Sequence, residues 1–115
     1  MPFPDKLSPA LRGGVAHLDG RVIYGLKGEI DMSGAEALRK HATDAAALSS
    51  GDLVLDLAEV TFIDSSGVRV LVQLHEQVRA EGRSLLLRGV EDEVRRLLDL
   101  VGVTELLTIE DSREG

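Results

Sequence analysis

The stretch Asp64-Ser65-Ser66-Gly67 places two hydroxyl groups between an acid and a glycine. An apolar run that ends at Ile63 precedes this turn, and an amphipathic segment, 68–79, follows it. This order predicts that a strand ends and a helix begins within the turn. Asp and Ser cap helix N-termini because their side-chain oxygens accept hydrogen bonds from the first free N–H groups. A hydroxyl at the positive end of a helix dipole is also placed to carry or approach an anionic group. On spacing alone, a helix cap and a functional site explain the turn equally well.

The known catalytic motifs do not fit these serines. A hydrolase elbow needs glycine two residues before and two residues after its serine, and neither Ser65 nor Ser66 has both. The sequence also lacks a Gly-x-x-x-x-Gly-Lys-Ser/Thr phosphate-binding loop, cysteine and any paired His/Asp/Glu metal motif. We expect structural or surface roles for the three histidines, His17, His41 and His75. The sequence therefore predicts no enzyme activity, no cofactor and no metal site.

The composition is that of an acidic single domain. The chain has 115 residues, of which 43% are hydrophobic and 29% charged, and its formal net charge is −7. An acidic surface repels nucleic-acid phosphates and anionic lipid headgroups, and an aromatic content of 3% argues against base stacking. The sequence shows neither a long apolar segment nor a signal-peptide pattern. We therefore expect no direct nucleic-acid or membrane partner, a cytoplasmic location, and a monomer that binds another protein.

The order of local signals predicts an α/β fold. Asp19-Gly20 between the apolar runs 15–18 and 22–26 predicts an antiparallel hairpin. Helical periodicity then alternates with apolar runs, which predicts a single domain with a mostly parallel mixed sheet and about three helices. The predicted helices span about 34–48, 68–79 and 92–101, and the later strands 53–57, 60–63, 84–88 and 103–109. We divide the chain into an irregular leader, 1–14, one domain, 15–109, and a polar tail, 110–115.

Three blocks of sequence, in a fixed order along the chain, together match the pattern of a known family. The first is 26–31, which ends in Gly28-Glu29-Ile30-Asp31, the second is 53–57 leading through 62–68, which contains Asp64-Ser65-Ser66-Gly67, and the third is 94–103. Together they resemble a STAS domain, specifically the bacterial anti-sigma factor antagonists, over about residues 15–109. The resemblance implies a STAS-like fold and a phosphorylation switch at the serine turn.

In that family, the serine directly after the Asp is phosphorylated by a partner anti-sigma factor, an ATP-dependent serine kinase that itself binds the ATP. The matching residue is Ser65, with Ser66 as the alternative. The unphosphorylated antagonist binds the kinase and so releases a sigma factor, and a PP2C-type phosphatase restores it. We therefore expect this protein to regulate transcription by partner switching. The expected partner-binding residues surround the turn: Asp31, Asp64, Ser65, Ser66, Gly67, Val68 and Arg69.

Two features depart from the family pattern. Arg69 stands where the family usually has a small residue, and only a short polar tail follows Ile109, where the family often has another helix. A cation beside the switch would alter the choice of partner or hold the added phosphate. The alternative function is that of a STAS-type scaffold or transport-complex subunit, which binds a partner without a phosphorylation cycle.

Overall fold

The computed structural model describes residues 2–110, which form a six-stranded mixed sheet and three helices. The strands lie in chain order across the sheet, and β1, β2 and β3 pair antiparallel, while β3, β4, β5 and β6 pair parallel. This confirms the predicted α/β class. The strands are β1 Asp5–Ser8, β2 Leu11–Leu18, β3 Arg21–Ile30, β4 Leu53–Ile63, β5 Leu85–Arg88 and β6 Thr108–Glu110, and the helices are α1 Met32–Ala46, α2 Ser65–Ala80 and α3 Asp92–Leu100.

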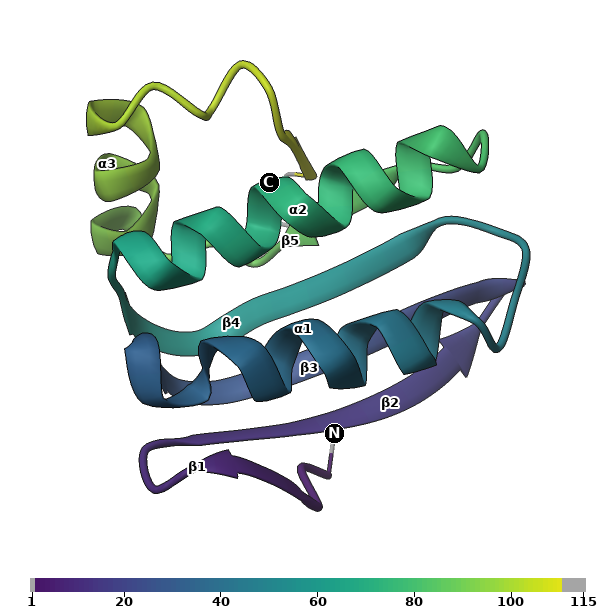
Figure 1. Cartoon of the computed structure of the whole chain (residues 1–115), viewed down its shortest axis with the longest axis horizontal. Coiled ribbons are helices and arrows are strands. Elements are labelled where there is room, and N and C mark those ends of the chain that lie inside the picture. The colour runs from purple at the N-terminus through teal and green to yellow at the C-terminus, as the bar shows by residue number, and fades with distance from the viewer. Residues whose placement is uncertain (1, 111–115) are drawn as a thin grey trace.

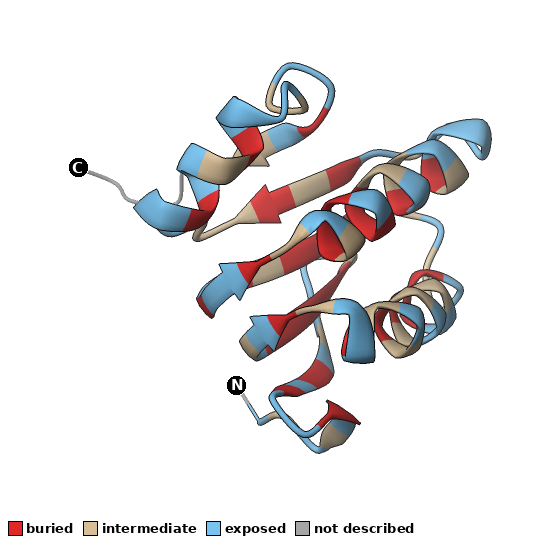
Figure 2. Cartoon of the chain, turned by 60° about the vertical axis from the view of Figure 1, so that its left-hand side comes forward, coloured by how far each residue is buried: buried red, intermediate tan, exposed pale blue. Residues whose placement is uncertain are grey.

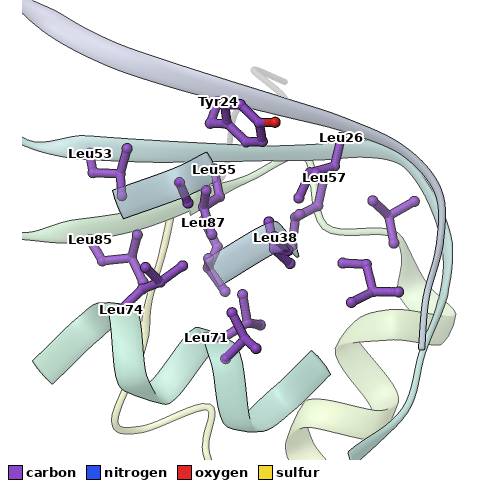
Figure 3. Packing of buried hydrophobic residues seen from close by; sticks show 14 of the residues in the cluster. Tyr24, Leu26, Leu38, Leu53, Leu55, Leu57, Leu71, Leu74, Leu85 and Leu87 are labelled. Carbon is purple, nitrogen blue, oxygen red and sulfur yellow. The ribbon is translucent and has the colours of Figure 1, made fainter. Parts of the chain in front are cut away.

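Helices α1 and α2 cover the central strands of the sheet, whose side chains form the apolar core. Helices α1 and α2 lie side by side on one face of the sheet, and α3 lies beside the start of α2 (Figure 1). Leucines of the central strands pack against Leu38 of α1 and against Leu71 and Leu74 of α2 (Figure 3). The buried residues of the helices follow their inner side (Figure 2). No helix within residues 2–110 is long and apolar enough to cross a membrane.

The predicted hairpin forms between β2 and β3. Both turn residues, Asp19 and Gly20, have positive φ, at 56° and 77°. Such a turn has the twist that antiparallel strands need.

The prediction of an irregular leader over residues 1–14 was wrong for the described part, because residues 5–8 form β1 and residues 11–14 begin β2. Leu7 and Leu11 bury their side chains in the core. The misleading signal was Gly13-Gly14, which reads as a chain breaker. In the fold, a Cβ on Gly13 would lie 2.5 Å from the hydroxyl oxygen of Tyr24. Glycine here makes room for a packed ring and does not end the strand.

Strand β4 and the C-terminal end also differ from the expectation. The predicted strands 53–57 and 60–63 are one continuous strand, whose register against β3 shifts between Asp56 and Glu59 and again between Val60 and Phe62. The predicted strand over 103–109 is shortened to Thr108–Glu110, preceded by turns. Glu110 of the predicted tail therefore belongs to β6, and residues 111–115 lie outside the described part of the chain.

Candidate functional site

The site is built where two neighbouring parallel strands end. Ile30 at the end of β3 and Ile63 at the end of β4 are register partners, and the Asp64 N–H donates to the Ile30 carbonyl at 3.1 Å. Each strand leads directly into a helix through an aspartate. The N-termini of α1 and α2 therefore lie next to each other at the carboxyl edge of the sheet, the edge at which ligands bind in open α/β folds.

Both helices begin with the same four-residue pattern. The pattern is Asp-x-Ser-Gly, in Asp31–Gly34 and in Asp64–Gly67. The Asp64 Oδ1 accepts hydrogen bonds from the Ser66 N–H at 2.9 Å and the Gly67 N–H at 3.2 Å. The Asp31 Oδ1 accepts from the Ser33 N–H at 3.0 Å and from the Ser33 hydroxyl at 2.6 Å. The hydrogen bond from the Ser33 hydroxyl, and to a lesser extent those from backbone N–H groups, hold the pKa of Asp31 below its usual range.

The shared pattern separates the two candidate serines. Ser65 is the first helical residue after its cap and is exposed, whereas Ser66 is half-buried. The residue at the equivalent first position of α1, Met32, is 78% exposed. The first position of each helix thus points its side chain away from the core. This makes Ser65 the more accessible hydroxyl of the pair.

Gly67 holds α2 close to the sheet. A Cβ at Gly67 would lie 2.6 Å from Ile63 Cγ1 and 2.7 Å from Ile30 Cγ2. Only a residue without a side chain fits between the helix and these two strand ends. Gly67 is therefore buried, and it positions the turn without forming part of its surface.

An apolar groove of about 490 Å³ runs from Ser65 towards α3. Helix α3 lies across from the start of α2 (Figure 1) and supplies one wall. The apolar lining comes from Phe62, Val68, Val94, Leu97 and Val101. Phe62 is 46% exposed and Val101 49%, although both are large apolar residues.

The charges at this groove are mostly negative. Asp64 and Glu93 line it together with Ser65. Arg69, one turn further along α2, is exposed, and none of the ion pairs among residues 2–110 involves it. The site therefore combines a free hydroxyl, unpaired acids and one arginine close in sequence to that hydroxyl.

The structure brings most of the predicted residues together. Asp31, Asp64, Ser65 and Ser66 lie at the two adjoining helix starts, with Arg69 on the next turn of α2. Gly67 and Val68 are buried, Val68 being 8% exposed and facing the groove.

Other polar groups serve elsewhere in the structure. Asp56 lies midway along β4, where its carboxylate pairs with Arg88 at 3.1 Å. The His41 Nδ1 lies 3.5 Å from the Asp5 carboxylate, beside β1.

Sequence reasoning missed four residues of this site. They are Met32, Phe62, Glu93 and Val101, which come from four different elements or element ends. The repeated Asp-x-Ser-Gly pattern could have identified Met32, as the counterpart of Ser65, but it was not used. Phe62 lies two residues before Asp64, so its place beside the turn followed from the sequence, although its exposure did not. No local signal identifies Glu93 and Val101, because α3 and its C-terminal end reach the groove only through tertiary packing.

Comparisons with known proteins agree with this architecture. The STAS domain family matches residues 14–115. The anti-sigma-B factor antagonist of Bacillus subtilis (strain 168) is 32% identical over 90 residues, which cover 78% of this chain and 82% of that protein.

Two solved structures are similar as well. An anti-sigma factor antagonist from Mycobacterium paratuberculosis has a TM-score of 0.77 and 27% identity, covering 89% of this chain and 87% of that one. The Bacillus cell fate determinant SpoIIAA in its phosphorylated form has a TM-score of 0.65 and 20% identity, covering 89% and 92%, and this likeness is one of fold. The family match and the curated relative show that this chain belongs to the STAS domain family, alongside the anti-sigma factor antagonists.

Proposed function

We propose that this protein is an anti-sigma factor antagonist whose unphosphorylated form binds an anti-sigma factor kinase and so releases a sigma factor. The observation that carries the proposal is the Ser65 hydroxyl, which is exposed at the start of α2 on the rim of an apolar groove. Relatives named as anti-sigma factor antagonists support it. In this role the protein acts in the cytoplasm, as a monomer, by binding a partner and not by catalysis.

The proposed partner contact uses the groove and the two helix starts together. Phe62 and Val101 expose apolar surface that a partner would bury, which releases water and favours binding. Asp64 and Glu93 beside them suit a cationic group of the partner, and the net charge of −7 favours a partner with a basic surface. We therefore propose that the kinase places apolar side chains in the groove and a basic side chain at its rim, while Ser65 enters its active site.

Release of the partner then follows from charge. A phosphate on Ser65 adds about −1.5 to −2 charges at neutral pH. This charge would arise at the mouth of the groove, which Asp64 and Glu93 also line. The phosphorylated chain loses affinity because the phosphate adds bulk and negative charge at the contact surface, without a change of fold. SpoIIAA, which shares the fold, has been solved in a phosphorylated form. We assign the reverse step to a PP2C-type phosphatase.

The test is phosphorylation by candidate anti-sigma factor kinases from the same genome, followed by intact-mass measurement and peptide mapping. We expect one phosphate, which Ser65→Ala abolishes and Ser66→Ala retains. Ser66→Ala is a matched control because the Asp64 cap accepts from the Ser66 backbone N–H and does not need its hydroxyl. Phosphate that persists in Ser65→Ala would assign the site to Ser66. Stable partner binding without phosphorylation by any kinase would favour the scaffold or transport-complex alternative.

The groove is tested separately by partner affinity. Phe62→Glu puts a charge in the groove, and we expect it to weaken binding of the unphosphorylated chain at least about tenfold. Leu18→Glu is the control, because Leu18 is 56% exposed beside the hairpin turn, at the opposite end of β3 from the site. Equal affinities of the two variants would exclude the groove as the contact surface.

A further inference from the structure

A phosphate on Ser65 would find few free hydrogen-bond donors on the backbone. The N-terminus of a helix normally offers its first N–H groups to an anion. In α2, the Asp64 carboxylate already accepts from the Ser66 and Gly67 N–H groups. The Val68 N–H is bonded to the Asp64 carbonyl at 3.0 Å. The helix start is therefore largely occupied by its own cap.

The surroundings of the phosphate are also unfavourable for a dianion. Asp64 and Glu93 line the same groove as Ser65, and neither takes part in an ion pair among residues 2–110. A second negative charge on the phosphate is repelled by both carboxylates. A nearby cation would have a large influence on the ionisation of this group.

Arg69 has the right position to supply that cation. It follows Ser65 by four residues in the same helix, so the two side chains share one face and are close enough to pair. Side chains in a helix lean towards its N-terminus, which directs the arginine back over the turn that holds Ser65. Arg69 is exposed, and none of the described ion pairs uses it. Its guanidinium offers a planar pair of donors that matches two phosphate oxygens.

We infer that Arg69 is the phosphate-holding residue of this protein and that it pairs with phosphoserine at position 65 within the same chain. The inference rests on the proposed function, because it needs Ser65 to be the modified residue. The pair favours the dianionic form of the phosphate and holds it over the first turn of α2. The phosphorylated state thereby keeps its full charge at the mouth of the groove, and Arg69 is withdrawn from any acidic group of the partner.

The experiment measures the second pKa of the phosphate by ³¹P NMR. Phosphoserine is installed at position 65 by genetically encoded incorporation, so no kinase is needed. The full-length chain is compared with Arg69→Ala, with Arg69→Lys and with two controls that remove the same charge elsewhere. The controls are Arg79→Ala, in the last turn of α2, and Arg96→Ala, on α3.

We expect Arg69→Ala to raise the phosphate pKa by about 0.2–0.4 unit, the scale of an exposed ion pair at this helical spacing. Arg69→Lys should restore part of the difference, since lysine keeps the charge but not the paired donors. The difference should shrink at high salt. An unchanged pKa in Arg69→Ala, or an equal shift in either control, would overturn the inference.

This result is separable from the proposed function. A kinase assay that finds no phosphate on Ser65 refutes the switch, whereas the NMR titration still reports whether Arg69 holds a phosphate there. Urea unfolding of each unphosphorylated variant checks the fold. We expect Arg69→Ala to unfold at an unchanged urea concentration, because alanine is at least as good a helix former as arginine.

Discussion

Replacing Gly67 by alanine would push a methyl group into two strand ends. The new Cβ would lie 2.6 Å from Ile63 Cγ1 and 2.7 Å from Ile30 Cγ2. Both contacts are with β-branched side chains whose χ1 angles are stiff, so neither can turn away easily. Overpacking costs about 1–3 kcal/mol, and two contacts this short with stiff side chains place the cost here at about 2–3 kcal/mol. Alanine returns at most about 1 kcal/mol through its higher helix propensity. We therefore expect Gly67→Ala to lower the free energy of unfolding by about 1–2 kcal/mol.

Gly34 provides a matched control in the same molecule. It occupies the equivalent third position of α1 after the Asp31 cap. Its added Cβ would meet Leu11 Cδ2 and the Ser8 side chain at 3.2 Å, contacts that small adjustments relieve. We expect Gly34→Ala to unfold within about 0.5 kcal/mol of the wild type, because the helix gain and the tight contact nearly cancel.

Urea unfolding followed by circular dichroism measures the difference. With a slope of about 1–3 kcal/mol per molar urea for a small domain, the midpoint of Gly67→Ala should fall by about 1 M with an unchanged slope. If Gly67→Ala is as stable as Gly34→Ala, then close packing against Ile30 and Ile63 is not what position 67 requires. The reasoning that places Gly67 as the spacer of the turn would then be refuted.

Three further predictions concern single side chains. Asp64→Ala should cost about 1–2 kcal/mol through loss of the helix cap, whereas Asp64→Asn, which keeps an acceptor, should unfold close to the wild-type urea midpoint; equal losses would contradict the capping role. Ser33→Ala should raise the pKa of Asp31 towards its usual value, as measured by carboxyl ¹³C titration. The lowered pKa of Asp31 stabilises the fold above the unfolded pKa, and this stability is lost as the pH falls, so the variant should show a smaller effect. An unchanged pKa of Asp31 would show that the hydrogen bond from the Ser33 hydroxyl is unimportant. Burial, and then the Asp5 carboxylate, raise the pKa of Tyr24, the single tyrosine, so its stabilising effect is present below its unfolded value of about 10 and is lost as pH rises above it. Phenolate absorbance should therefore appear together with unfolding in alkaline solution, and at a higher pH in the wild type than in Asp5→Asn. Phenolate that appeared at a lower pH in the wild type than in Asp5→Asn would contradict this account.

Local signals were sufficient wherever the responsible groups lie within a few residues of each other. The Asp19-Gly20 hairpin was predicted correctly because both turn residues adopt positive φ, which their own types favour. The start of α2 was predicted because Asp64 caps residues that follow it directly in the chain. The leader was predicted wrongly because position 13 needs a glycine to leave room for the ring of Tyr24, a residue on the neighbouring strand.

The sequence by itself determined the chemistry of the serine turn: a capped helix start, a hydroxyl at its first position and an acidic chain around it. The tertiary structure decided what that turn faces. The ladder between β3 and β4 joins Ile30 to Ile63 and so brings the Asp31 and Asp64 caps side by side. The packing of α3 against the end of β4 creates the groove beside Ser65. These neighbours are distant along the chain, and only the burial of a shared apolar core, which no local pattern encodes, brings them together.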